Sequence, residues 1–284
     1  MSESILNNDF PPTPNAEIDS KKYFDAYMTA RDRLTKKTEV FKGIDLSACI
    51  LELTGHIYWH DDHHAALFRR RNDASDVACE LWLSKVRTIA KWFIHANGLP
   101  EFNGISKDEL FQLPRNFITS ESIRNIPEYL SKFGIVLIFQ PALQGMKMDG
   151  AIFKTPSRQV VISLSLRYPR LDHFWFTLMH ELAHAHLHLD ILDTPIIDDL
   201  DQKADSEIEE SANRLAANSL ISSSVWRANP VKFNPKEEVV RAFAKAIGVA
   251  PQIVAGRYQR DVNRYDIFSD IVNEFNTREI LNKT

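Results

Sequence analysis

Apolar residues recur at steps of three and four along the first hundred residues of the chain, which is the spacing of one face of an α-helix. The pattern predicts helices over about 21–42, 46–53 and 75–96. The sequence Asn97-Gly98-Leu99-Pro100 interrupts this helical region and predicts a domain boundary. We therefore expect an all-helical N-terminal domain at 20–97, preceded by a polar, proline-containing flexible tail at 1–19.

The period changes to that of β-strands between residues 134 and 163. Short β-rich runs lie at Gly134–Phe139, Gly150–Phe153 and Gln159–Ser163. A helix at 120–133, interrupted near Pro127, precedes them, and the turn-forming sequence Thr155-Pro156-Ser157-Arg158 separates the last two runs. Three short strands so close together predict a small, mainly antiparallel sheet.

Helical spacing returns after the sheet. Helices are predicted at Leu171–His188, Ser206–Ile221, Glu237–Ile247 and Pro251–Arg260. Asp172 is the expected N-cap of the first helix, and Gly248 is the expected C-cap between the last two. The whole pattern predicts an α+β fold, in which the helical region precedes a domain at 98–284 made of a small antiparallel sheet and the helices that follow it.

Composition narrows the classes of protein that fit. A chain of 284 residues suits one large domain or two ordinary ones, and its 44% of hydrophobic and 25% of charged residues are typical of globular proteins. The two cysteines, Cys49 and Cys79, provide neither a disulfide framework nor a cysteine-ligated zinc site. The N-terminus does not resemble a signal peptide, and no run of about 18 apolar residues occurs, so we expect a cytoplasmic protein.

The charge of the chain argues against a dedicated nucleic-acid binder. The net charge is −4 and the sequence pI is about 6.2, whereas such proteins usually carry a basic domain or stripe. The compact basic run Arg69-Arg70-Arg71 has Asp61, Asp62 and Asp73 beside it, and we interpret it as a solvated surface. Direct nucleic-acid binding is therefore not expected, and a DNA-binding regulator is disfavoured.

The sequence His180-Glu181-Leu182-Ala183-His184 has the spacing of the zinc-binding helix of metallopeptidases. Two histidines four residues apart leave the same helix face, so both imidazoles can bind one ion. The residue after His180 is turned by about 100° around the helix, so Glu181 can reach a zinc-bound water but cannot easily be a ligand. We predict that His180 and His184 bind Zn²⁺ and that Glu181 is the catalytic base.

Such a site needs a third protein ligand and an open position for water. The metzincin pattern requires histidine where this chain has Asp190 and glycine where it has Leu187, so that class is excluded. The other solution is a glutamate from a later helix.

The predicted helix at Ser206–Ile221 begins with a group of acidic residues that can supply this ligand. Glu209 is favoured, with Glu210 and Glu207 as alternatives, because an acidic first turn is also stabilised by the helix dipole alone. Asn213 lies one turn beyond Glu209, so its amide can orient a ligand histidine from behind.

The remaining histidines have simpler interpretations. His186 and His188 lie near the end of a helix, where histidine is electrostatically favoured. His188 is one turn beyond His184, so a supporting role behind the ligand or a second metal is the alternative. We interpret a further cluster as a polar loop and not as a metal site: His56, His60, His63 and His64.

Several segments together carry a resemblance to a known family. They are Leu164–Tyr168, Asp172–His184, Glu209–Ala216 and Gly248–Arg257. On these segments the chain resembles the ImmA/IrrE family of metallopeptidases over about residues 120–262. More narrowly, it resembles the peptidase-like region attached to some HigA-type antitoxin regulators.

The resemblance implies a gluzincin-like zinc site, with Glu181 as base and the glutamate of the later helix, here Glu209, as third ligand. Members typically cleave or regulate helix-turn-helix repressors, or are fused to such a module. This chain departs from the pattern at Ala183, where the family usually has glycine, and at 1–97, which shows no helix-turn-helix unit. The DNA-binding half is therefore missing, replaced or supplied by another chain.

We predict a zinc-dependent endopeptidase that cleaves a regulatory protein, such as a helix-turn-helix repressor or a toxin–antitoxin partner. The alternative is a non-cleaving antitoxin or regulatory subunit that binds a partner protein through the same fold, although the intact Glu181 argues against it. Tyr168 and His173 are candidates for stabilising the oxyanion, with ordinary structural roles as the simpler interpretation. The substrate is expected to bind in extended form along an edge strand at Gly150–Thr155.

Overall fold

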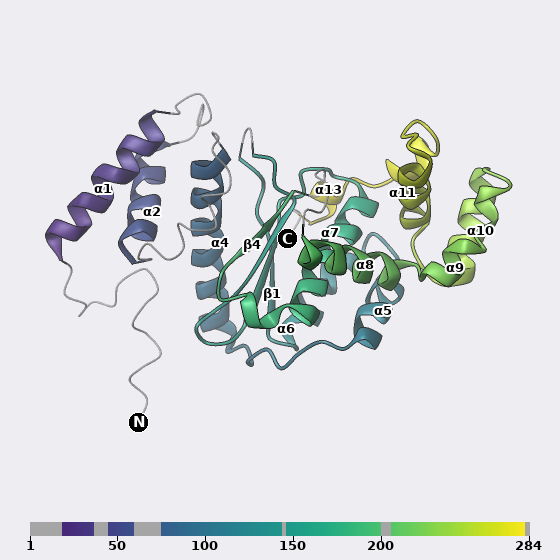
Figure 1. Ribbon diagram of the computed structural model, residues 1–284, viewed down its shortest axis with the longest axis horizontal. Helices are drawn as coiled ribbons and strands as arrows, with labels where there is room; N and C mark the ends of the chain where they lie inside the picture. Colours follow the sequence, from purple (N-terminus) through teal and green to yellow (C-terminus); the bar gives the residue numbers. More distant parts are fainter. Residues whose placement is uncertain (1–18, 37–44, 60–74, 144–145, 200–205, 282–284) are drawn as a thin grey trace.

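The computed structural model describes residues 19–36, 45–59, 75–143, 146–199 and 206–281. Within them the fold is α+β, with a helical N-terminal region, a small sheet and further helices, which confirms the predicted fold class (Figure 1). The predicted tail at 1–19, apart from Asp19, lies outside the described residues. So do the basic run at 69–71 and three histidines of the predicted polar loop: His60, His63 and His64.

Three helices form the N-terminal region. They are α1 (Ser20–Thr35), α2 (Leu46–Trp59) and α4 (Ser75–Asn97). Asp19 begins α1, because its carboxylate accepts hydrogen bonds from the first free backbone N–H groups. The three helices share an apolar cluster that includes the fully buried side chains of Leu34, Leu53 and Leu81. All three begin within one residue of the predicted positions, but α1 ends at Thr35 and α2 continues to Trp59, beyond its predicted end at 53. Residues 37–42 of the first predicted helix lie outside the described residues.

The sheet contains β1 (Ile135–Phe139), β2 (Gly150–Lys154), β3 (Val160–Leu164) and β4 (Ile196–Asp198), in the order β1-β3-β2-β4. β2 pairs antiparallel with β3 and with β4, but β1 runs parallel to β3. The sheet is therefore mixed and not antiparallel throughout. The reason is topological: β3 inserts between β1 and β2, which run in opposite directions, so it must be parallel to one of them.

The edge of the sheet also differs from the expectation. The sequence pattern does not predict β4, which pairs with Gly150, Ala151 and Ile152 of β2. The prediction that Gly150–Thr155 forms an edge strand is therefore wrong, since β2 has a neighbour on both sides.

Helices cover both faces of the sheet (Figure 1). α7 (Leu171–Leu187) lies on one face, and α4 lies on the other. The core on the α7 side includes Leu137, Ile152, Ile162, Trp175 and Leu178. The core on the α4 side includes Trp82, Val86, Val136, Ala151 and Val161. Alternate strand residues enter opposite cores, which explains why the strands are apolar runs without polar alternation. The boundary at 97/98 stays a prediction, but α4 packs on the sheet that follows it.

Two helical segments before the sheet differ from the prediction. The pattern does not predict α5 (Lys107–Asn116), which begins with a capping box formed by Ser106 and Glu109. The helix expected at 120–133 is a 3₁₀ turn, η2 (Ser122–Asn125), followed by the short α6 (Ile126–Ser131). Pro127 lies in the first turn of α6, where its missing N–H costs no hydrogen bond.

α7 and α8 (Glu207–Leu220), which pack against each other, occupy the predicted ranges. The N-cap of α7 is Arg170 and not Asp172, whose carboxylate lies in the first turn and pairs with Arg170 at 2.8 Å. The other elements are η3 (Leu189–Ile191), α9 (Ser223–Arg227), η4 (Pro230–Lys232), α10 (Glu237–Ile247), α11 (Pro251–Val262), α12 (Ser269–Val272) and α13 (Thr277–Leu281).

Gly248 ends α10 at a φ of 70°, as predicted for a C-cap glycine. Among the described residues no single helix is both long and apolar enough to cross a membrane. α10 and α11 reach that length and composition only as a pair joined at a 118° bend.

Candidate metal centre

α7 directs two imidazoles toward one point. His180 and His184 are fully buried, and their Nε2 atoms lie 3.0 Å apart. They leave the helix on the same face because they are separated by one turn. α8 packs against α7, so its first turn comes close to these two rings.

Glu209 reaches the imidazoles from the first turn of α8. Its Oε2 lies 3.3 Å from His180 Nε2, and its Oε1 lies 3.6 Å from His184 Nε2. The two alternatives, Glu207 and Glu210, are exposed. Within the described part of the chain, neither belongs to the group of converging donor atoms. The structure therefore brings Glu209, and not its neighbours, to the two histidines.

Asp198 is a fourth member that the sequence analysis missed. It is the last residue of β4, and its Oδ2 lies 3.4 Å from His180 Nε2 and 3.9 Å from His184 Nε2. The local sequence gives little indication of its role, because Asp198 lies outside the motif helix and in an acidic stretch. The one available signal is the pair Ile196-Ile197 after Pro195, which is compatible with a very short strand that ends at Asp198.

The donor atoms fit a tetrahedral metal ion. Zinc binds nitrogen and oxygen ligands at about 2.0–2.1 Å, so its tetrahedral ligands lie about 3.3 Å from one another. The five separations given above run from 3.0 to 3.9 Å. Asp198 Oδ2 is also buried without a hydrogen-bond partner in the described part of the chain, as expected for an oxygen that binds a cation. His180, His184, Asp198 and Glu209 can therefore hold a metal ion.

Asn213 fixes the orientation of the first imidazole. Its Oδ1 lies 3.0 Å from His180 Nδ1. An amide oxygen can only accept a hydrogen bond, so Nδ1 carries the proton and donates it. The lone pair of His180 then lies on Nε2, which faces the other donors.

His188 and Ser211 do the same for the second imidazole. His184 Nδ1 lies 3.0 Å from His188 Nδ1, and His188 Nε2 lies 3.1 Å from Ser211 Oγ. Burial lowers the pKa of His188, so its neutral ring can accept the hydrogen bond from His184 at Nδ1. His186 points away from the centre, with Nδ1 2.7 Å from the carbonyl oxygen of Ile105. His188 is therefore the supporting residue of the pair.

A comparison with known protein families agrees with this geometry. Residues 130–258, from the end of α6 to α11, match the model of a peptidase family described as the IrrE N-terminal-like domain. This region belongs to the ImmA/IrrE family. It contains the whole sheet with α7 and α8, while α1, α2, α4 and α5 lie outside the match. No curated protein matches the chain significantly.

In this IrrE-like domain Glu181 belongs to α7, and its side chain lies against Gly150, the first residue of β2. Its side chain is fully buried, and both carboxylate oxygens lack a hydrogen-bond partner among the described residues. Gly150 is in contact with it, because a Cβ at this position would collide with Glu181 Oε1. Glycine thus allows the backbone of β2 to approach the carboxylate.

The carboxylates gathered at the IrrE-like centre favour the binding of a cation. Burial, followed by the charge of Asp198, raises the pKa of Glu181 well above its usual value. Burial acts to lower the pKa of His180, but the carboxylates of Asp198, Glu209 and Glu181 outweigh it and raise that pKa to about 10. Burial acts to raise the pKa of Glu209, but hydrogen bonds from His180 and His184 hold it well below its usual range. A proton on His180 therefore occupies part of the place of a metal ion.

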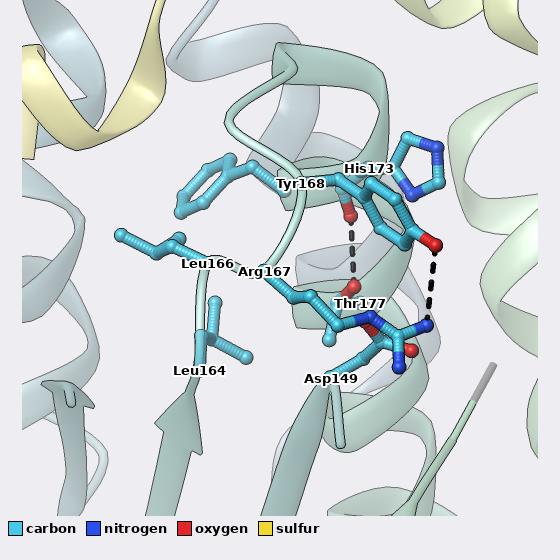
Figure 2. A pocket seen from close by; sticks show the side chains of 8 residues that line it. Asp149, Leu164, Leu166, Arg167, Tyr168, His173 and Thr177 are labelled. Carbon is cyan, nitrogen blue, oxygen red and sulfur yellow. Dashed lines mark hydrogen bonds and ion pairs between the residues drawn. The ribbon is translucent and has the colours of Figure 1, made fainter. Parts of the chain in front are cut away.

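A small pocket of the IrrE-like domain adjoins the centre at the ends of β2 and β3 (Figure 2). Arg167 extends across it beside the ring of Tyr168, and its Nε lies 3.3 Å from Asp149. The rings of Tyr168 and His173 lie 4.7 Å apart at the rim. Neither belongs to the converging donors, so their role in stabilising an oxyanion stays a prediction. His56, which is predicted to lie in a polar loop, is a buried residue of the helix α2, near Arg87 and not at this centre.

Proposed function

We propose that the chain is a zinc-dependent endopeptidase of the gluzincin type. In this proposal His180, His184 and Glu209 hold the ion, and Glu181 is the general base. The observation that carries it is the position of Glu181, a fully buried carboxylate beside converging metal donors in a domain of a peptidase family. A site that held a metal only for structure would not need this extra carboxylate, whose burial is unfavourable.

The proposed chemistry follows from the surroundings of Glu181. Bound zinc would lower the pKa of a water molecule and polarise the scissile carbonyl. Glu181 takes a proton from the attacking water and passes it to the leaving amine nitrogen. Burial raises the pKa of Glu181, which makes its carboxylate a stronger proton acceptor than an exposed one. Asn213 and His188 keep the two imidazoles in the tautomer that leaves Nε2 free.

The proposed substrate is a regulatory protein, either a helix-turn-helix repressor or the partner of a toxin–antitoxin pair. The family resemblance supports this choice. The net charge of −4 also supports it, because this charge makes direct DNA binding by the chain unfavourable. In this proposal the partner binds the DNA.

A second candidate is a regulatory subunit that binds a partner without cleaving it. Asp198 favours it, because four protein donors would close the coordination sphere. Structural zinc sites have four protein ligands, whereas catalytic sites keep one position for water. The two candidates differ in whether Glu181 is needed.

Glu181→Gln separates them, because it keeps the size of the side chain and removes the base. Both chains are loaded with zinc and analysed for metal content. They are then incubated with a proteome-derived peptide library, and products are identified by mass spectrometry. The comparison is repeated in the Asp198→Ala background, which lacks the fourth donor. We expect equal zinc content and a loss of cleavage by about 10²–10⁴-fold.

Two outcomes would contradict the peptidase. Products that persist at the same rate in Glu181→Gln would exclude this residue as the base. Zinc-loaded chains that give no Glu181-dependent product in either background would favour the non-cleaving subunit.

A further inference from the structure

β4 occupies the place that an extended substrate needs. It pairs antiparallel with β2 in the register Gly150 with Asp198, Ala151 with Ile197 and Ile152 with Ile196. Gly150 is also the strand residue whose backbone touches Glu181. A scissile bond must lie beside Glu181, so the backbone groups of β2 that could hold an extended peptide there are the ones that β4 already uses.

Asp198 extends this obstruction into the metal centre. If His180, His184 and Glu209 held the ion, Asp198 Oδ2, which lies 3.4 Å from His180 Nε2, would be a fourth protein donor to it. In catalytic zinc sites the fourth position belongs to water or substrate. β4 therefore covers the strand edge and the open metal position at the same time.

Asp199, the residue after β4, holds the end of this strand in place through an ion pair. Asp199, whose side chain is only 2% exposed, pairs with Arg167 at 3.4 Å, and Arg167 also pairs with Asp149. The backbone N–H of Asp149 donates to Asp198 O at 2.8 Å. Figure 2 shows Arg167 reaching from the end of β3 toward Asp149, with its guanidinium beside the ring of Tyr168. This arrangement holds Asp198 over the imidazoles.

β4 closes one side of the centre, and the strand itself is short. The side chains of His180, Glu181 and His184 are fully buried, whereas that of Glu209 is 21% exposed, so a peptide does not reach the two histidines or Glu181 in this arrangement. β4 is only three residues long. Beyond the strand pairing it is held by the packing of Ile196 and Ile197 against the two cores and by the ion pair of Asp199. A segment that pairs with β2 more extensively can therefore displace it.

We propose that residues 196–199 are an internal blocking strand that keeps the peptidase latent. On activation, an extended segment of another protein replaces β4 beside β2, and water replaces the Asp198 carboxylate at the metal position. The covalent structure of the chain does not change. This proposal rests on the proposed function, because latency presupposes an activity. Its geometric part, the closed metal position, can be tested without any cleavage.

The test uses cobalt(II) in place of zinc, since the absorption of cobalt reports its ligands, and acetohydroxamate as a probe that binds an open metal position. Wild type, Asp198→Ala and the control Asp190→Ala, which changes an exposed aspartate, are titrated with the probe. We expect Asp198→Ala to respond at concentrations at least about tenfold lower than the other two chains, because the closed state no longer competes. Zinc-loaded Asp198→Ala should cleave the peptide library faster, and adding Glu181→Gln should abolish that cleavage.

Asp199→Asn provides a second variant that keeps all proposed ligands and weakens only the pairing with Arg167. We expect a smaller shift in the same direction. The blocking strand is overturned if wild type binds acetohydroxamate as readily as Asp198→Ala. It is also overturned if both variants lose the metal without opening the site, because Asp198 is then a structural ligand. If both variants open the cobalt site but no chain gives Glu181-dependent products, the blocking strand stands and the proposed peptidase function fails.

Discussion

Neighbouring glutamates of α8 have opposite surroundings, and this contrast defines the centre at the scale of single residues. Glu209 lies within 3.6 Å of the imidazoles of His180 and His184, while Glu210 is exposed to solvent. They follow each other in the sequence, so helix propensity and net charge cannot distinguish them. Only the direction in which each leaves the helix does, since adjacent residues differ by about 100°.

Glu209→Ala should therefore weaken zinc binding strongly, whereas Glu210→Ala should not. Substitutions of residues that hydrogen-bond to metal ligands typically weaken metal binding by 10–100-fold. Substitution of a ligand itself should therefore weaken zinc binding by more than about 100-fold. Competition with a chromophoric zinc chelator measures the affinities of both variants. Similar affinities for the two, or a larger loss in Glu210→Ala, would show that α8 presents a different residue to the metal.

The part of the site that can be predicted from the sequence is the part set by helix geometry. His180, Glu181 and His184 have a fixed relation on one helix, and Glu209 with Asn213 repeats that relation on the next. Asp198 is different, because it reaches the centre only through the pairing of β4 with β2. A three-residue strand has almost no signal of its own, and its partner lies far away in the chain.

At the scale of elements, the contact between β2 and α7 depends on one missing side chain. The backbone of Gly150 lies against Glu181, and a Cβ there would also come within 3.1 Å of Thr177. The strand and the helix are consequently as close as a glycine allows, and the carboxylate is confined between them.

In the Asp198→Ala background, which lacks the blocking carboxylate, Gly150→Ala should displace Glu181 and lower cleavage by about 100-fold, because a misplacement of about 1 Å is enough for such a loss. It should also reduce the free energy of unfolding by about 1–3 kcal/mol through overpacking. Peptide cleavage and urea denaturation measure the two effects. The double variant with Glu181→Asp, which has a shorter side chain, should recover stability, and an additive result would mean that the collision is elsewhere.

Elements are predictable where one period runs long enough. α4, α7, α8 and α10 have such periods, and each lies in its expected range. The short α5 does not, because it has only 10 residues and contains Pro114. The N-cap of α7 differs for another reason: Asp172 is a good capping residue, but it is used in the pair with Arg170. The direction of β1 depends on strand order, which periodicity does not contain.

At the scale of the whole molecule, the IrrE-like domain is supported by a helix outside the family match. α4 covers the sheet face opposite α7, with the Trp82 side chain fully buried in that core. Trp82 Nε1 also donates to the carbonyl oxygen of Gln140, directly after β1. The break at Gly98 and Pro100 therefore interrupts the helical pattern without separating the layers that pack together.

Trp82→Ala should destabilise the sheet, although the residue is far in the sequence from the residues of the candidate metal centre. The expected loss in the free energy of unfolding is about 3–5 kcal/mol, as for other large aromatic side chains removed from a core. Trp92→Ala, on the same helix but with the side chain 60% exposed, should change it little. Denaturant unfolding followed by circular dichroism compares them, and equal stabilities would mean that α4 does not support the sheet.

The donor set of the metal centre contains only imidazole nitrogen and carboxylate oxygen. Thiolate ligands are lost when peroxide oxidises sulfur, but imidazole and carboxylate groups have no place on that oxidation ladder. The same set offers nothing to soft cations such as Cu(I), which select sulfur. Peroxide and soft metal ions therefore find no sulfur ligand to attack in this centre, unlike in cysteine-based zinc sites.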